Sequence, residues 1–317
     1  MQNSNQTNGQ EPEFQVEGSI VYLTNIRGSE RAHSQPFTVA RKGRQWKIRT
    51  TNLNDADPDH WEMSSDGLRI YELHQFDENA LRQKHGDLGD RYTAWGWVRH
   101  GSFPVGFDLE LIYPLWLAYC SSDYFASLKD NRIVSPAWLL DNHCPTQPPV
   151  PSNLPLPAKW KFNDSSFVSE IQWYSEGKEL MLDWEAVDAR VKLVTYPPPY
   201  DAGFVYASFE TTDWIDYSQL RLPRSFALKT FSPNLAADPI YGEFILVYTV
   251  DAKVDTIQRL KNFSCLPELA RKTLITDSRF PENPGSKRPL YYGSSSGWLT
   301  GEEIEAKLKS KETWHRI

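Results

Sequence analysis

The chain has 317 residues, of which 40% are hydrophobic and 13% aromatic, including 12 Trp. This length and apolar content suffice for one large domain or two ordinary ones with a substantial core. The formal net charge is −7, and the absence of a basic excess excludes a general nucleic-acid-binding surface. The composition therefore predicts a β-rich globular protein with no nucleic-acid partner, because aromatic residues favour pleated, half-buried surfaces.

Neither a membrane span nor a signal sequence is predicted. The longest apolar run, Leu111 to Cys120, is interrupted by Pro114 and is about half the length that a spanning helix needs. The first residues are rich in Asn and Gln and have neither a basic nor an apolar region, so they do not read as a secretory signal. We expect residues 1–13 to be a disordered tail.

The three cysteines, Cys120, Cys144 and Cys265, are far apart and include no C-x-x-C motif. Buried, inert thiols are the first expectation, and one disulfide with one free thiol is the alternative. A zinc site needs about four ligands at workable spacing, which the sequence lacks. No metal and no cofactor is predicted.

Residues 14–144 form the first predicted β-rich half, with a helical insertion. Residues 37–49 alternate around an Arg-Lys-Gly-Arg turn, which predicts a hairpin, and Asp66-Gly67 introduces another strand. Residues 77–84 predict a short helix capped by Asp77. Residues 109–128, broken by Pro114, predict two short helices, and Ser135-Pro136 predicts the start of a third.

Residues 145–157 carry six prolines and predict an extended crossover. The second β-rich half covers residues 158–317, and both halves are expected to combine in one domain. A hairpin is predicted from residues 171–174 and 180–184, followed by strands at 204–209, 226–231 and 243–250, and a helix at 266–274. The last helix begins at a capping box formed by Thr300 and Glu303.

Two motifs are weighed and set aside. Gly293 to Gly297 matches G-x-S-x-G, but only 20 residues follow it and His315 is the sole later histidine, so a chance match in a Gly/Ser loop is favoured. The acidic run Asp55, Asp57, Asp59 to Glu62 lacks the EF-hand spacing and predicts a solvated loop.

The Trp and Tyr content has two interpretations: a well-packed core, or an apolar, aromatic-lined concavity for a hydrophobic ligand. The second makes aromatic residues on alternating strands the candidate ligand-binding positions. These are Trp46, Tyr71, Trp95, Trp97, Trp173 and Trp184.

Two stretches resemble a known family. Residues 18–22 and 37–48, with "G-x-x-W-x-I", and residues 65–71, with "D-G-x-x-x-Y", resemble the opening of LolA/LolB-like lipoprotein carriers. Residues 209–226, with a Leu-Pro phrase before a strand, and the ending Trp298 to Glu303 are similar to uncharacterised bacterial envelope proteins of that type. The resemblance implies an incomplete β-barrel around helices, export to the periplasm or cell envelope, and a lipid or acylated protein as partner.

The sequence thus predicts a mainly β, α+β fold: a curved antiparallel sheet with helices packed on its concave side. The leading functional hypothesis is a non-enzymatic protein that binds a lipid, lipoprotein or other hydrophobic ligand. The alternative is a protein–protein interaction or scaffold module that uses a strand edge or the proline segment. A hydrolase with a site assembled from distant residues is a third hypothesis.

Overall fold

The structure is a computed structural model that describes residues 12–26, 29–52, 59–86, 92–101, 109–134, 156–183, 190–235, 242–270, 272–281, 289–293 and 297–310, with residues 88, 103, 104, 136, 237 and 295. The predicted tail up to residue 11, the predicted crossover up to residue 155, and most of the helix predicted to start at Ser135 lie outside these residues, as do Cys144 and Trp184.

The chain forms two compact units. Unit 1 contains Met1–Glu17, Pro36–Pro104 and Asp255–Ile317, and unit 2 contains Gly18–Gln35 and Val105–Val254. Three of the four boundaries fall inside long strands, β1 (Glu13–Ile26), β2 (Ser29–Lys42) and β14 (Phe244–Gln258). No helix in the described part of the chain is long and apolar enough to span a membrane.

The described residues form 16 strands and few helices. In hydrogen-bonding order the main sheet runs β16-β15-β6-β5-β4-β3-β2-β1-β14-β13-β12-β9-β8-β7, and β10 pairs with β11 in a second sheet. Strands β16 and β7 end this order without pairing to each other, so the sheet is open. The predicted class, mainly β with an incomplete barrel, is therefore confirmed.

In unit 1 the strands from β2 to β6 pair in antiparallel fashion with their neighbours. Strand β15 then pairs with β6 in parallel, whereas the sequence predicted an antiparallel sheet. The further elements of unit 1 are β3 (Gln45–Asn52), β4 (Asp59–Ser65), β5 (Arg69–Phe76), α1 (Glu78–His85), β6 (Ala94–His100), β15 (Thr273–Pro281), β16 (Pro289–Gly293) and α5 (Gly301–Ser310). Helix α5 packs through Ile304 and Leu308 on a core that includes Tyr71, Val98 and Ile275.

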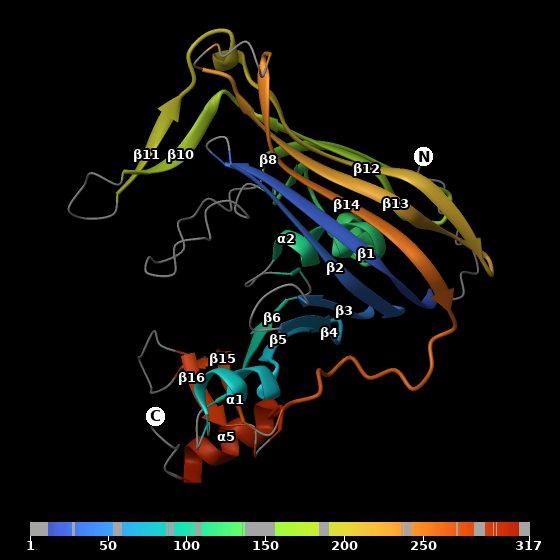
Figure 1. The fold of residues 1–317 in the computed structure, drawn as a ribbon, viewed down its shortest axis with the longest axis vertical. Helices are drawn as coiled ribbons and strands as arrows, with labels where there is room; N and C mark the ends of the chain where they lie inside the picture. The colour runs from blue at the N-terminus through green and yellow to red at the C-terminus, as the bar shows by residue number, and fades with distance from the viewer. Residues whose placement is uncertain are drawn as a thin grey trace. The chain divides into compact units, whose positions relative to one another are not determined.

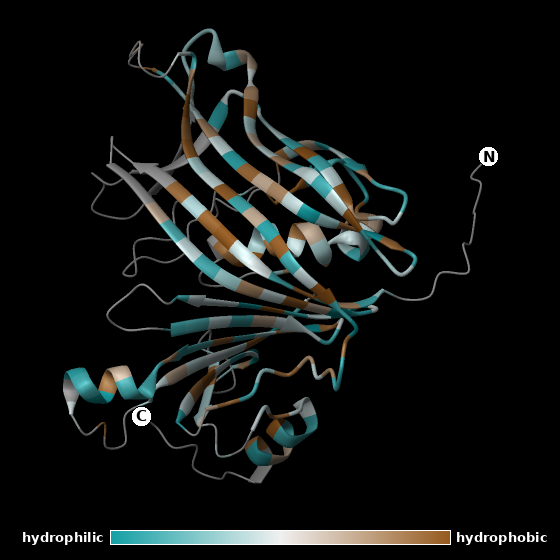
Figure 2. Cartoon of the chain, turned by 45° about the vertical axis from the view of Figure 1, so that its right-hand side comes forward, coloured by the Kyte–Doolittle hydropathy of each residue, from teal (hydrophilic) through white to brown (hydrophobic). Residues whose placement is uncertain are grey.

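Unit 2 carries long, curved strands whose residues alternate between apolar and polar, as the bands in Figure 2 show. Its further elements are α2 (Leu109–Tyr119), α3 (Ser122–Ser127), β7 (Arg132–Ile133), β8 (Leu156–Phe162), β9 (Val168–Ser175), β10 (Lys178–Asp183), β11 (Arg190–Thr195), a 3-10 turn (Tyr200–Ala202), β12 (Phe204–Tyr217) and β13 (Leu220–Pro233). Helix α2 lies on the inner side of these strands (Figure 1) and packs on β13 and β9.

Several local predictions are confirmed. Asp77 caps α1 by accepting hydrogen bonds from the backbone N–H groups of Asn79 and Ala80. The Thr300 hydroxyl and the Glu303 carboxylate exchange hydrogen bonds with each other's backbone N–H. The hairpin over residues 37–49 forms between β2 and β3, and the two helices expected in residues 109–128 are α2 and α3.

Two local predictions are wrong. Residues 266–274 are not helical: an irregular segment leads into β15, which gains its hydrogen bonds from β6 and β16. Strands β9 and β10 do not form a hairpin, since β9 pairs with β8 and β12 while β10 pairs with β11. In both cases partners that are distant in the chain override the local pattern.

Candidate functional site

One face of the unit 1 sheet carries a row of polar and charged side chains. Lys47 and Arg49 alternate with the buried Trp46 and Ile48 along β3, so they point to the face opposite the latter pair. The register pairs Arg49 with Glu62, and His60 with Gln75. Because directly paired residues share a face, these side chains lie together; we call this face the pocket face.

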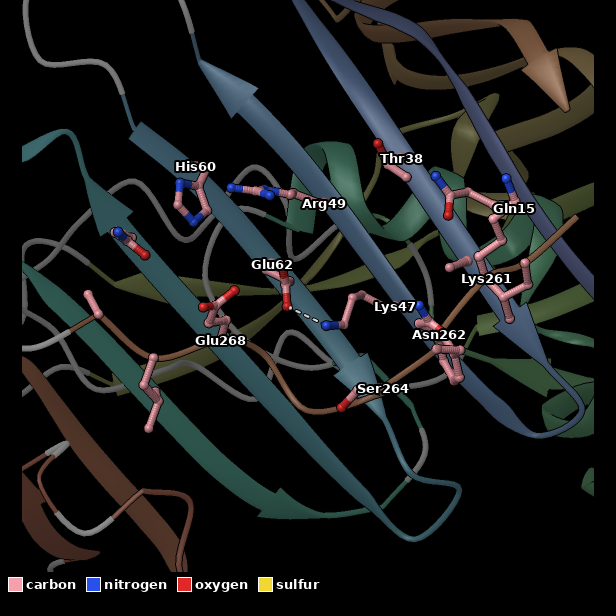
Figure 3. Close-up of a pocket in the computed structure, with 16 residues that line it drawn as sticks. Gln15, Thr38, Lys47, Arg49, His60, Glu62, Lys261, Asn262, Ser264 and Glu268 are labelled. Atoms are coloured by element: carbon pink, nitrogen blue, oxygen red, sulfur yellow. Dashed lines mark ion pairs between the residues drawn. The ribbon is translucent and has the colours of Figure 1, made fainter. Parts of the chain in front are cut away.

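An irregular segment, residues 260–270, lies over the pocket face and forms with it a half-open cavity of about 630 Å³. The Lys47 ammonium fixes the segment by donating to the Leu266 carbonyl at 3.0 Å, and the Trp298 indole N–H donates to the Pro267 carbonyl at 2.8 Å. All residues that line the cavity belong to unit 1. Figure 3 shows the strand side chains on one side and the segment on the other.

The cavity is mainly polar. Its charged lining residues are three cations, Lys47, Arg49 and Lys261, and two anions, Glu62 and Glu268. Lys47 and Glu62 form an ion pair of 3.1 Å. The side chains of Arg49 and Glu268 form no ion pair or hydrogen bond with each other or with any other residue that the structure describes. Their charges are therefore available to a ligand.

His60 completes the polar row. Burial, and then the positive charges of Arg49 and His74, lower its pKa to about 4, against a smaller opposing effect of Asp59. The imidazole is therefore neutral at physiological pH and can accept or donate a hydrogen bond. In Figure 3 the Arg49 guanidinium points toward His60.

The opposite face of the unit 1 sheet holds an aromatic group. His74 stacks on Trp61 with ring centroids 3.8 Å apart, and Phe76 and Trp95 pack against this pair. The His74 ring nitrogen Nε2 lies 2.6 Å from an Asp59 carboxylate oxygen. Asp59 and Glu62 thus belong to strand β4 rather than to the predicted acidic loop, whose Asp55 and Asp57 lie outside the described residues.

The six candidate ligand-binding residues do not gather in one place. Trp46, Trp95 and Trp97 share the aromatic face of unit 1, whereas Tyr71 lies on the pocket face under Trp298. Trp173 is fully buried in unit 2, where its indole N–H donates to the Val134 carbonyl. Trp184 is outside the described residues. Ligand binding by these residues stays a prediction.

The inner face of unit 2 is apolar. Ile171, Trp173, Phe209, Phe226 and Leu228 from the strands are almost completely buried. Helix α2 covers them. Its residues from Leu111 to Tyr119 are all apolar and buried, and each of them apart from Pro114 is at most 1% exposed. A helix that is apolar on all sides is typical of a buried position. The Tyr113 hydroxyl donates to the Val134 carbonyl, and the Tyr119 hydroxyl donates to the Pro223 carbonyl.

Sequence reasoning missed the polar pocket. The alternation of Lys47 and Arg49 along β3, and of His60 and Glu62 along β4, was a readable signal that these side chains share a sheet face. The covering segment gives no such signal, because the local pattern of residues 266–274 predicts a helix.

The remaining motifs do not add to these sites. Ser295 of the G-x-S-x-G match follows β16, but its flanking serines and His315 lie outside the described residues. Cys120 is buried and Cys265 half-buried, and both are free thiols. Among the described residues no group of three metal-ligating side chains is present.

No protein-family model matches the sequence, and no curated protein matches it. A comparison with solved structures finds a similarity to a domain from Vibrio parahaemolyticus, described as an outer membrane lipoprotein-sorting protein domain. The sequence identity is 8% and the TM-score is 0.30, over 80% of this chain and 87% of that one.

Proposed function

We propose that this protein binds a hydrophobic ligand, such as the acyl chain of a lipid or lipoprotein, on the inner face of unit 2. One observation carries the proposal: an open, curved sheet presents an apolar face, and an equally apolar helix, α2, occupies it. An acyl chain offers that face the same non-directional contacts as the helix does. Trp173 is the candidate residue that this proposal retains in the site.

Helix α2 is suited to being displaced. It has only 11 residues, and helices of this length are marginal without tertiary contacts. Pro114 lies inside it, and an internal proline removes a backbone hydrogen bond. The helix is therefore held by its apolar contacts, and a ligand that supplies such contacts competes with it directly.

Binding of an acyl chain is tested with native mass spectrometry of the purified full chain, with extraction of any lipid that copurifies. The second measurement is quenching of tryptophan fluorescence by dibromostearate, because Trp116 and Trp173 are buried at this face. We expect uptake of the fatty acid, with quenching reduced in Trp173→Phe. A mass without ligand, together with no uptake of added fatty acid, contradicts the proposal and favours the scaffold alternative.

A second variant tests whether the ligand displaces α2 from the inner face. Tyr119→Phe removes the 2.7 Å hydrogen bond to Pro223 while keeping the apolar ring, so the helix leaves more readily and ligand uptake increases. Tyr291→Phe is the matched control, because Tyr291 is 41% exposed in unit 1. Equal uptake by both variants would show that α2 stays in place and that the ligand binds elsewhere.

The envelope location follows only from the resemblance, and we propose it on that basis. Fractionation of cells that produce the protein from its natural gene tests it, with recovery in the periplasmic or membrane fraction as the expected result and recovery in the cytosol as the contrary one.

A further inference from the structure

We infer that the unit 1 pocket binds a small zwitterion, a molecule with a phosphate or carboxylate at one end and an ammonium group at the other. This inference is independent of the hydrophobic-ligand proposal, because the pocket belongs to unit 1 and its lining is polar. The shared chemistry can come from a free metabolite or from a lipid headgroup, and the experiment below separates the two sources.

The oxyanion end is recognised by Arg49. Its guanidinium points along the floor of the pocket toward His60 (Figure 3) and has no ion pair or hydrogen bond among the described residues. A guanidinium binds phosphate and carboxylate through two parallel hydrogen bonds. His60 adds a neutral donor beside it, and Lys261 adds a second cation from the covering segment.

The ammonium end is recognised by carboxylates. Glu268 projects from the covering segment and, like Arg49, has no charged partner within the part of the chain that the structure describes. Glu62 lines the same pocket, and it is 7% exposed and paired with Lys47. Because Lys47 is already paired with Glu62, the Glu268 carboxylate is left to bind the ammonium group of a ligand.

The two ends lie in one cavity without pairing to each other. Arg49 comes from β3 and Glu268 from the segment that covers it, and they form no ion pair. A ligand with both charges satisfies both side chains, whereas a simple anion or cation satisfies one. The volume of about 630 Å³ falls within the range of about 300–1,000 Å³ of small-molecule sites.

An acyl chain does not suit this pocket. It would remove water from Arg49, Glu62 and Glu268 without replacing their hydrogen bonds, which is unfavourable for charged groups. The floor is kept open by small side chains, Thr38 and Ala40, opposite Arg49 and Lys47. The two units therefore present different chemistry to ligands.

The test is isothermal titration calorimetry of the full chain with O-phosphoethanolamine and with glycine as zwitterions, and with inorganic phosphate and ethanolamine as single-charge probes. We expect at least one zwitterion to bind more tightly than both single-charge probes. Arg49→Gln and Glu268→Gln each weaken binding by about tenfold or more, as expected for a charge-assisted hydrogen bond.

Matched controls are Arg82→Gln on α1 and Glu302→Gln on α5, which are charged residues of unit 1 outside the pocket lining. These leave binding unchanged. Arg49 and Glu268 are exposed, so their variants are expected to fold, and a circular dichroism melt checks this. The inference is overturned if no zwitterion binds, if phosphate alone binds as tightly, or if the pocket variants behave as the controls do.

Vesicles separate the two sources of ligand. The protein is sedimented with vesicles of phosphatidylcholine, with and without phosphatidylethanolamine, whose headgroup is a zwitterion with a free ammonium group. Retention that requires phosphatidylethanolamine, Arg49 and Glu268 supports a lipid headgroup. Binding of the soluble zwitterion without such retention supports a free metabolite.

Discussion

The pocket face of unit 1 and the inner face of unit 2 are built from the same kind of strand, yet they differ in chemistry. Both use residues that alternate along antiparallel strands. In unit 2 the alternate residues are apolar and meet a helix whose residues from Leu111 to Tyr119 are all apolar. In unit 1 charged residues meet an irregular segment that contributes backbone carbonyls and a carboxylate.

The comparison shows that the covering element decides what each face can bind. An apolar face needs an apolar cover or an apolar ligand, because exposure of that surface to water is unfavourable. A charged face under an irregular segment retains water and leaves charges open to a polar ligand. Variants that change residues of one unit only therefore test whether unit 1 and unit 2 are stabilised by different interactions.

The largest effect is expected where unit 1 buries charge. The side chains of Asp277 and Arg279 are 0% and 2% exposed, and Arg279 Nη2 lies 2.6 Å from Asp277 Oδ2. The Arg279 guanidinium also donates to the Leu299 carbonyl. Asp277→Ala leaves a buried, unpaired cation and should lower the free energy of unfolding by about 3–5 kcal/mol.

Urea denaturation followed by circular dichroism measures this loss. Asp213→Ala is the control, because its pair with Arg224 is about half-exposed and such pairs contribute about 0–1 kcal/mol. Equal losses in the two variants would mean that the Asp277 pair does not stabilise unit 1.

The corresponding change in unit 2 is apolar. Leu115 of α2 is 0% exposed, so Leu115→Ala loses buried area and creates a cavity, at a cost of about 2–5 kcal/mol. The same denaturation experiment applies, with Leu68→Ala as control because Leu68 is 74% exposed. If α2 already leaves the inner face in solution, the loss will be as small as that of the control.

Predictability from sequence follows the same division between local and distant contacts. Asp77 and the Thr300–Glu303 pair act within one helical turn, so their roles were readable directly. The hairpin around Gly43 was readable because its strands are adjacent in the chain. The open, mainly β fold followed from alternation and from the family resemblance.

Distant contacts were not readable. Strand β15 depends on β6, almost 180 residues earlier in the chain, whereas the local pattern of residues 266–274 predicts a helix. Likewise the pairing of β9 with β12 rather than β10 is decided by the sheet as a whole. The pocket depends on both kinds of contact. Its strand side chains share a face because they alternate along neighbouring strands, whereas the segment that covers them, residues 260–270, is distant in the chain.

A smaller loss of stability is expected when the N-terminal cap of helix α5 in unit 1 is removed. Helix α5 has a capping box, whereas α2 relies on burial. Thr300→Ala removes the hydroxyl that accepts from the Glu303 N–H and should cost about 1 kcal/mol, measured by thermal unfolding. Thr300→Ser keeps a hydroxyl and should restore most of this stability; a serine variant as unstable as the alanine variant would show that the cap is not the cause.

An effect of the same size is a pH dependence that arises in the pocket. The pKa of His60 is lowered to about 4 by burial and by the nearby positive charges, against about 6.5 in the unfolded chain. The folded state therefore disfavours the protonated imidazole. His60 does not affect stability above about pH 6.5, and stability falls as the pH decreases from about 6.5 to about 4.

The size of this loss is about 1 kcal/mol, because His60 is only partly buried and solvent screens its charge. His60→Gln should flatten this part of the curve of unfolding free energy against pH, measured by urea denaturation at successive pH values. His100→Gln on the exposed end of β6 should leave the curve unchanged. A His60→Gln curve with the original slope would show that a group other than His60 causes this part of the pH dependence.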